Sequence, residues 1–288
     1  NRSLIDKNDF SIDIGGNIAF NKSKIQNLGG TPEDIYINGN IENRVFYRGQ
    51  NISTGNYFRA PANIFMEGEE VGLFYGFETD GIYQTEDVIT VSGAQAGDVR
   101  IVDQNGDDAI TEADRTIIGN PNPDFVYGGY LSMNYKRLNL SIQMNGVYGN
   151  EIANGNSIQL GTAEGRSANI LSQAYNNAWR PDAQSNTYPR VGYSRESGSP
   201  AITDRIIEDG SFLRISNITL GYDIPVEKTT VFSSANVYVT GMNLFTFTDY
   251  SGYNPEITNF MNNGNIVGVD WNGFPNAQTI MLGLNLKF

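Results

Sequence analysis

Oxygen-bearing side chains recur at alternate positions in one acidic stretch of the sequence. In twelve residues they stand at positions one, three, five, nine and twelve, and position seven offers a backbone carbonyl. This spacing matches the ligand positions of an EF-hand loop, and hard oxygen ligands suit Ca²⁺. The stretch therefore predicts a Ca²⁺ site with these ligands: Asp103, Asn105, Asp107, the carbonyl of Ala109, Thr111 and Asp114.

The stretch departs from the EF-hand pattern at two positions. Asp108 stands at position six, where the sharp turn of such a loop takes glycine, although Gly106 lies two residues earlier. Asp adopts the left-handed backbone conformation only at some energetic cost. Asp114 at position twelve has a shorter side chain than Glu, which weakens ligation. The alternative to a metal site is a turn held by hydrogen bonds to Asx side chains.

The composition limits the chemistry open to the chain. Its 288 residues include neither Cys nor His. Disulfides and thiol chemistry are therefore excluded, and the commonest general base and metal ligand are absent. The net charge is -13, whereas binding to a nucleic-acid backbone needs clustered Lys and Arg. We therefore predict that the chain is not an enzyme and has no nucleic-acid partner.

Alternating apolar and polar residues predict the elements that position these groups. Near the end of the chain one face of a strand is apolar, with Ile280, Leu282, Leu284, Leu286 and Phe288, and the other carries the polar or small residues Thr279, Gly283, Asn285 and Lys287. Side chains of a strand point alternately to its two faces, so this segment has one apolar and one polar face. A tilted strand of about 9 to 11 residues crosses the hydrocarbon of a membrane. The final segment has the length and pattern of such a strand.

The same pattern recurs along the chain and predicts about eight antiparallel strands. Tyr and Phe residues stand near several strand ends, as in the interfacial girdles of outer-membrane barrels. No stretch approaches 18 consecutive apolar residues, so strands are the only elements with which the chain is expected to cross a membrane. The predicted strands are Asp9 to Phe20, Arg44 to Phe58, Gly68 to Phe77, Phe125 to Tyr135, Arg137 to Tyr148, Ile206 to Tyr222, Ser234 to Phe245 and Gln278 to Phe288.

The predicted connections alternate between short and long. The short ones cover Lys136 to Arg137 and Pro225 to Phe232. The long ones cover Asp80 to Pro123, Gly149 to Arg205 and Thr246 to Ala277. In outer-membrane barrels short turns face the periplasm and long loops face outwards. We therefore predict an all-β fold, an antiparallel transmembrane β-barrel with long extracellular loops, although a soluble β-sandwich also shows alternating strands.

Five blocks of sequence, in order along nearly the whole chain, carry a family resemblance. They are Phe20 to Ile25, Gly68 to Gly76 with Asp80 to Gln84, Asp114 to Pro123, Gly241 to Tyr250, and Leu284 to Phe288. With these blocks the chain resembles the C-terminal barrel region of SusC/RagA-type TonB-dependent transporters. The third block, which joins the acidic stretch to the sequence RTIIGNPNP, is the most specific. The chain starts without an initiator Met or a signal peptide, so we expect an excerpt of a longer protein.

The resemblance implies a fold, a location and partners. Residues 1–288 would form the C-terminal portion, about eight strands, of a barrel of about 22 strands. The plug domain and the TonB box of the family are not recognised in this chain. The implied activity is TonB-dependent import of glycan or peptide fragments across the outer membrane of a Gram-negative, Bacteroidetes-type bacterium. The implied partners are a SusD-like lipoprotein that covers the barrel, TonB, outer-membrane lipid, and an oligosaccharide or peptide substrate.

Aromatic side chains in the long connections are candidate contacts with substrate or lid. Flat aromatic faces stack on sugars and anchor interfaces. The alternative for each is local packing within its loop. The second long connection also has a predicted short helix from Ala168 to Trp179, which Pro181 would end. The candidate residues are Trp179, Tyr188, Tyr253, Trp271 and Phe274.

Two other functions remain open from the residues. One is a passive porin or adhesin barrel, which would need neither a plug nor TonB. The other is a secreted β-sandwich that binds or hydrolyses carbohydrate. A glycosidase needs two facing carboxylates, and Glu69, Glu208 and Asp209 are candidates without any pattern that pairs them.

Overall fold

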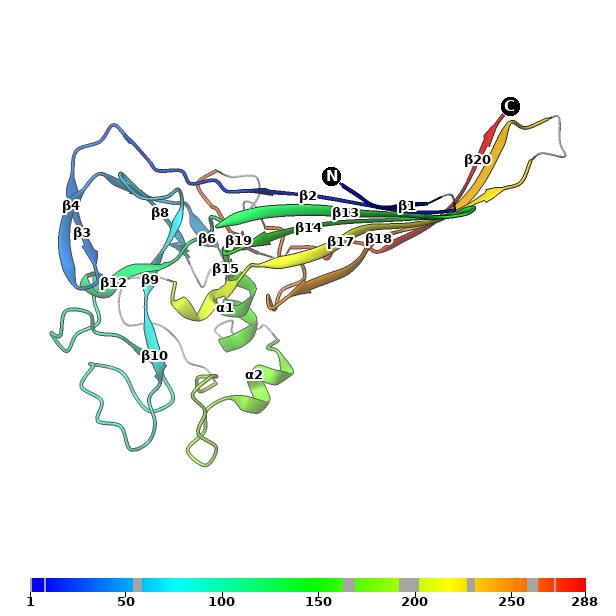
Figure 1. Ribbon diagram of the computed structural model, residues 1–288. Coiled ribbons are helices and arrows are strands. Elements are labelled where there is room, and N and C mark those ends of the chain that lie inside the picture. The colour runs from blue at the N-terminus through cyan, green and yellow to red at the C-terminus, as the bar shows by residue number, and fades with distance from the viewer. Residues whose placement is uncertain are drawn as a thin grey trace.

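The computed structural model describes residues 2–7, 9–53, 59–162, 169–191, 202–226, 231–257, 264–271 and 273–288. It has two regions, a long sheet and a compact group of small sheets and helices at one end of that sheet (Figure 1). We call the sheet the wall and the compact group the head. Nearly all of the regular structure is antiparallel β, as the sequence predicted.

The wall is a seven-stranded sheet in which neighbours in sequence are also neighbours in space. Every pair of neighbouring strands is antiparallel. The first and last strands of the order each have one neighbour, so the sheet is open. The strands are β1 (Arg2–Lys7), β2 (Phe10–Ala19), β13 (Phe125–Tyr135), β14 (Leu138–Tyr148), β17 (Phe212–Ile224), β18 (Ser234–Thr248) and β20 (Thr279–Lys287).

The register of the wall puts apolar side chains on one face and polar side chains on the other. One row across β2 to β20 contains Ile12, Met133, Leu140, Leu220, Val239 and Leu282. The next row, on the opposite face, contains Asp13, Ser132, Ser141, Thr219 and Thr240, and it is polar up to Met281 in the last strand. Because the side-chain period is two, a slip of one residue would exchange the faces. The alternation in the sequence therefore determines the register.

Short turns join wall strands at the end away from the head, and three long connections, residues 20–124, 149–211 and 249–278, run through the head (Figure 1). Tyr135 pairs with Leu138, so only Lys136 and Arg137 join β13 to β14. Lys136 has a φ of 55°, the left-handed conformation that such tight hairpins use. The predicted alternation of short and long connections is confirmed, but the first long connection begins after β2 at residue 20 rather than at Asp80. Residues 227–230 of the predicted short connection Pro225 to Phe232 lie outside the described residues.

The head contains short strands and helices from all three long connections. Its larger sheets have the orders β12-β9-β8-β5 and β16-β15-β19, and β3-β4, β6-β7 and β10-β11 form pairs. The strands are β3 (Glu33–Ile37), β4 (Asn40–Arg44), β5 (Phe46–Arg48), β6 (Asn51–Ser53), β7 (Arg59–Pro61), β8 (Asn63–Met66), β9 (Leu73–Phe77), β10 (Thr79–Ile82), β11 (Val99–Ile101), β12 (Arg115–Gly119), β15 (Glu151–Asn154), β16 (Ile207–Asp209) and β19 (Val269–Asp270). The helices are α1 (Gly155–Thr162), α2 (Ser172–Asn177) and the 3-10 helices η1 (Glu112–Asp114) and η2 (Asp204–Ile206).

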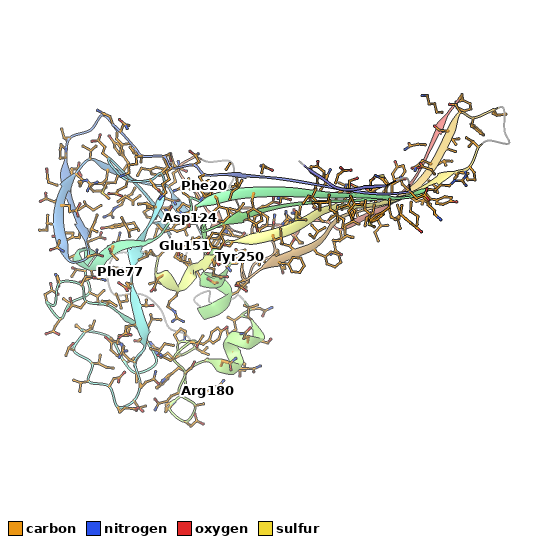
Figure 2. The ribbon with its side chains drawn as sticks, in the orientation of Figure 1. Phe20, Phe77, Asp124, Glu151, Arg180 and Tyr250 are labelled. Carbon is orange, nitrogen blue, oxygen red and sulfur yellow. The ribbon has the colours of Figure 1, made fainter. Side chains whose placement is uncertain are left out.

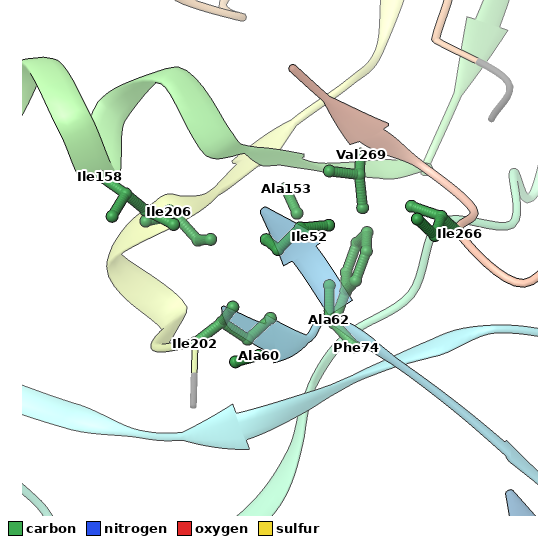
Figure 3. Close-up of a cluster of buried hydrophobic side chains, with 10 residues drawn as sticks. All are labelled: Ile52, Ala60, Ala62, Phe74, Ala153, Ile158, Ile202, Ile206, Ile266 and Val269. Atoms are coloured by element: carbon green, nitrogen blue, oxygen red, sulfur yellow. The ribbon is translucent and has the colours of Figure 1, made fainter. Parts of the chain in front are cut away.

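A hydrophobic core holds the head together (Figure 3). Its members come from all three long connections, and Phe74 at its centre is fully buried. A smaller cluster, which includes Ile35, Ile64 and Tyr75, is formed by side chains of β3 and of the four-stranded sheet. The residues of the main core are Ile52, Ala60, Ala62, Phe74, Ala153, Ile158, Ile202, Ile206, Ile266 and Val269.

Polar contacts also join the long connections. The buried side chain of Asn63 donates to the carbonyls of Gly72 (2.7 Å) and Val267 (2.9 Å), and its oxygen accepts from the Val267 N–H (3.0 Å). β15 pairs in parallel with β19, although the two strands belong to different connections. The long connections are therefore one packed unit rather than separate loops.

Two of the eight predicted strands were placed wrongly, because they belong to the head. The prediction over Gly68 to Phe77 corresponds to β9, whose five residues are all buried. A strand buried on both faces has no apolar and polar sides, so alternation cannot place it. The prediction over Arg44 to Phe58 breaks into short strands, and residues 54–58 lie outside the described residues. The wall instead includes β1, which the sequence analysis missed.

Smaller differences concern strand ends and helices. The strand predicted from Ile206 begins at Phe212, because Ile206 and the residues after it form η2 and β16. The predicted helix over Ala168 to Trp179 is the six-residue α2, and residues 163–168 lie outside the described residues. Helix α1 was not predicted. Among the described residues, no helix is both long and apolar enough to cross a membrane.

Candidate functional site

The polar face of the wall has a shallow hollow of about 310 Å³. The hydroxyls of Thr219 and Thr240 lie 2.9 Å apart across it, and the Asn236 amide donates to Asp223 at 2.8 Å. A surface of this kind offers hydrogen-bond donors and acceptors with little net charge, which suits a neutral polar ligand or water. The hollow is lined by Ser132, Asn139, Leu140, Ser141, Thr219, Gly221, Asn236, Tyr238, Thr240 and Asn285.

A second cavity, of about 420 Å³, lies in the head. Arg205 in η2 donates to the carbonyl of Thr187 on its rim. The Glu208 carboxylate accepts from the N–H (2.8 Å) and the hydroxyl (2.9 Å) of Ser251. The cavity therefore combines apolar walls with two charged groups that are held by protein partners. Its lining is Val99, Ser157, Ile158, Gly161, Leu171, Gln173, Thr187, Tyr188, Pro189, Thr203, Arg205, Ile206, Glu208 and Ser251.

A buried polar network lies where the head meets the wall, near the labelled Tyr250 in Figure 2. Asn154 donates to Glu208 at 2.8 Å. The Tyr250 hydroxyl donates to the Asp270 carboxylate at 2.6 Å. Burial raises the pKa of the Tyr250 phenol far above its usual value, and the hydrogen bond and negative charge of Asp270 raise it further. Tyr250 therefore stays neutral and serves as a hydrogen-bond donor to a buried carboxylate.

Two of the five candidate aromatics pack within the head. Trp179 is 7% exposed, and its indole N–H donates to the Gln84 side chain at 3.0 Å. Its ring lies against Gly97, where no larger side chain would fit. Trp271 lies in the same way against Gly155 at the start of α1. For Trp179 and Trp271 the contacts of these rings match the local-packing alternative.

The other three candidate aromatics have accessible surface. Tyr188 lines the head cavity. Tyr253 and Phe274 are 77% and 88% exposed, and both belong to the third long connection. A side chain this exposed contributes nothing to the core, so its ring is available to another molecule.

The acidic stretch forms a turn held by its own side chains. The Asp103 carboxylate accepts from the backbone N–H groups of Gly106 (2.7 Å) and Asp108 (2.7 Å). Desolvation raises the pKa of Asp103, but the N–H groups of Asp108, Gly106 and Asp107 and a hydrogen bond with Asp114 outweigh it, so the pKa lies below its ordinary value. Asp108 has a φ of 61°, the left-handed conformation expected at position six.

The side-chain oxygens of Asn105, Asp107, Thr111 and Asp114 also accept hydrogen bonds within the protein. Asp114 is fully buried, and its two oxygens accept from the N–H groups of Gln104 (2.9 Å) and Thr111 (2.7 Å). Within the described ranges, no group of three or more His, Cys, Asp or Glu side chains is arranged to hold a metal ion. The turn has the geometry of the Asx alternative, and Ca²⁺ binding stays a prediction.

Sequence reasoning missed Arg214, a buried charge on the polar face of the wall. Its side chain is 5% exposed and donates to Thr246 (3.0 Å), to Asn254 (2.8 Å) and to the Glu256 carboxylate. The signal was available, because Arg214 is a cationic residue inside a predicted strand. Its partners could not be found from local spacing, since Glu256 lies 42 residues later.

Comparison with curated proteins identifies relatives over the whole chain. No protein-family model matches. TonB-dependent receptor P3 of Formosa agariphila is 32% identical over 300 aligned residues, which take in 100% of this chain and 28% of the relative. TonB-dependent receptor SusC of Bacteroides thetaiotaomicron is 28% identical over 97% of this chain and 25% of the relative. By sequence, the chain is a relative of the SusC/RagA-type TonB-dependent transporters.

Solved structures agree with this family in fold. A structure of the RagAB peptide transporter superposes with a TM-score of 0.71 at 21% identity, over 99% of this chain and 28% of that one. The RagAB peptide importer in its closed-closed state gives a TM-score of 0.68. The chain thus spans about a quarter of the length of its SusC/RagA-type relatives. The wall and the head together reproduce the fold of that part of the family.

Proposed function

We propose that the protein containing this chain is an outer-membrane, TonB-dependent importer of glycan or peptide fragments. The observation that carries this proposal is the two-faced wall beside a packed head. Its apolar face would contact lipid, and its polar face would line the lumen. The sequence relatives named as TonB-dependent receptors support active rather than passive transport.

Aromatic clusters at the two ends of the wall support its placement in a membrane. Phe125 stacks on Tyr148 with ring centroids 5.0 Å apart and lies 5.6 Å from Phe20, next to the head. Phe10 and Tyr135 meet edge to face at the other end, 6.2 Å apart. Ten residue steps from Phe125 to Tyr135 cover about 34 Å along the strand, or about 24 Å across a membrane at a tilt of about 45°. That height matches the apolar band of outer-membrane barrels, about 25 Å.

The head would then face the outside of the cell, where it would meet substrate and a SusD-like lipoprotein. The exposed rings of Tyr253 and Phe274 support a contact of this kind. Coupling to TonB would involve parts of the protein other than the wall and the head. The chain has no His or Cys for acid–base or thiol catalysis, which fits a transporter rather than an enzyme.

The full-length protein in outer membranes tests the proposal. A barrel should run as a heat-modifiable band in denaturing electrophoresis. Cells producing it should take up either a fluorescent tryptic digest of casein or a fluorescent neutral-glucan hydrolysate, and a protonophore should stop that uptake. Uptake that continues with the protonophore would favour the passive porin. A soluble species without a heat shift would contradict the barrel and favour the β-sandwich.

Ca²⁺ binding by the acidic stretch has a separate test. If the turn holds Ca²⁺, millimolar Ca²⁺ should raise the melting temperature of the head, and Asp103→Ala should abolish the shift. Asp34→Ala is a matched control, because Asp34 is an exposed carboxylate in β3 outside the stretch. An unchanged melting temperature in the parent protein would show that the turn is held by hydrogen bonds alone.

A further inference from the structure

A buried arginine on the polar face of the wall holds two turns of the third long connection. Arg214 lies opposite Asn145 and Thr246 in the register, and its side chain is 5% exposed. Its Nε donates to the Thr246 hydroxyl at 3.0 Å, within the wall. Its two terminal nitrogens donate to side chains outside the wall strands, those of Asn254, Glu256 and Asn276.

The first turn supplies an amide and a carboxylate. Arg214 Nη2 donates to the Asn254 oxygen at 2.8 Å, and Nη1 donates to the Glu256 carboxylate. Asn254 also accepts from the Glu256 N–H at 3.2 Å, so the turn is closed around the guanidinium. The side chains of Asn254 and Glu256 have few rotatable bonds. Their hydrogen bonds to Arg214 therefore also restrict the backbone of residues 254–256 relative to the wall.

The second turn supplies another amide. With the Asn276 amide oriented so that its oxygen faces Arg214, that oxygen accepts from Nη1 at 2.8 Å and from Nη2 at 3.3 Å. The planar guanidinium carries five N–H donors in a fixed arrangement, so it can hold two turns at once in one relative position. A lysine, with one ammonium group, cannot reproduce that fork.

The two turns have a common sequence pattern. Each contains an aromatic residue next to or before a proline: Gly-Tyr253-Asn254-Pro-Glu256 in the first and Gly-Phe274-Pro-Asn276 in the second. In each turn the residues that bind Arg214 lie within three positions of the aromatic. Tyr253 is 77% exposed and Phe274 is 88% exposed. The cluster therefore combines a buried anchor with two solvent-facing rings.

We propose that Arg214 is a positioning residue that fixes Tyr253 and Phe274 as a paired aromatic surface above the polar face of the wall. The ligand it suits has flat apolar faces, such as the rings of an oligosaccharide. The contact with substrate rests on the proposed function, whereas the positioning does not. A proline one residue after Phe274 and two residues after Tyr253 restricts the backbone further and lowers the entropy lost when a ligand binds.

Hydrogen exchange on the full-length protein tests the positioning. Arg214→Met keeps most of the side-chain length and removes all donors, and we expect exchange at least tenfold faster in residues 249–257 and 273–278. Arg214→Lys should give an intermediate increase. Arg180→Met is the matched control, because Arg180 is an arginine at the far end of the head (Figure 2). Equal exchange in the parent and both Arg214 variants would overturn the proposal.

A second variant covers the case in which Arg214→Met does not fold. Glu256→Gln keeps the shape of the turn and removes the charge of the carboxylate. It should speed exchange in residues 249–257 more than in the wall strands. If exchange in that segment stays at the parental rate in Glu256→Gln and in Asn254→Ala, the proposal is wrong.

Uptake of a fluorescent neutral-glucan hydrolysate tests the substrate contact. Arg214→Lys should raise KM about fivefold and leave the maximal rate within twofold. The double variant Tyr253→Ala/Phe274→Ala should do the same, and adding Arg214→Lys to it should raise KM no further. If Arg214→Lys raised KM by the same factor in the double variant as in the parent, Arg214 would not act through Tyr253 and Phe274. That result would overturn the positioning role. If the parent takes up neither glucan nor casein peptides, the importer proposal fails, and the exchange result still decides the role of Arg214.

Discussion

The wall and the head bury their apolar side chains in different ways. The largest fully buried side chains, among them Phe74, Ile52 and Ile202, all lie in the head. In the wall, Ile280 and Leu282 are each 76% exposed, although they are as apolar as the buried isoleucines of the head. The head is stabilised by a core of the kind found in water-soluble proteins, whereas the wall is held by backbone ladders and leaves its apolar face to another apolar phase.

The largest expected effect is loss of the head core. Phe74→Ala removes a fully buried ring from a core to which all three long connections contribute, and it should destabilise the head by about 3–5 kcal/mol. Limited proteolysis should then cut the head faster, while the barrel keeps its heat-modifiable band. Phe274→Ala is the control, because a ring that is 88% exposed contributes little to stability. Equal proteolysis in the two variants would contradict the existence of a separate head core.

A charge on the apolar face of the wall should have the next largest effect. Ile142→Arg places a cation in the middle of the apolar band and should cost about 2–4 kcal/mol in a bilayer. Gln143→Arg, one position along the same strand, points to the polar face and should cost much less. Guanidinium unfolding of the full-length protein in lipid vesicles measures both. Equal costs would mean that the two faces do not meet different solvents.

The head should lose stability at alkaline pH through Tyr75. Burial raises the pKa of Tyr75 to about 12, against 10.0 when unfolded, and its hydroxyl donates to the Tyr36 carbonyl at 2.8 Å. Between these pH values the unfolded chain loses the phenolic proton and the folded head keeps it, so stability falls as pH rises. The loss should reach about 3 kcal/mol. Thermal melting from pH 9 to 12 measures it, and Tyr75→Phe should flatten the curve.

The smallest effect concerns one helix cap in the head. The Thr111 hydroxyl accepts from the Ala113 N–H at the start of η1, and Asp114 completes a capping box. Thr111→Ala should cost about 1 kcal/mol, and Thr111→Ser should restore most of it. Differential scanning calorimetry of the head transition measures the pair. A serine variant as unstable as the alanine variant would show that the hydroxyl does not cap η1.

The wall could be predicted from the sequence because its two faces meet different surroundings. β13 was predicted with the bounds it has, β14 differs from its prediction by one residue at one end, and β20 differs by one residue at each end. The alternation that an apolar phase imposes is local, so a window of ten residues contains the information.

The head could not be predicted in this way because its contacts are distant. Asn63 and Val267 are 204 residues apart, and neither has a local pattern that indicates the other. The acidic stretch was recognised as a turn with Asx side chains or a metal, and its hydrogen bonds depend only on neighbours. Candidate aromatics were identified by residue type alone, so buried Trp179 and exposed Phe274 were not distinguished.

The strand pair β15-β19 has a consequence for the order of folding. Val269 and Ile266 belong to the same core as Ile52 and Phe74, and they lie in the connection before the last wall strand, β20. Contacts this far apart in sequence form late and slow folding, because a long loop must close before they gain any free energy. The head therefore stays unfinished until almost the whole chain is present. A truncation before residue 266 would leave an open core and remove the last wall strand with it.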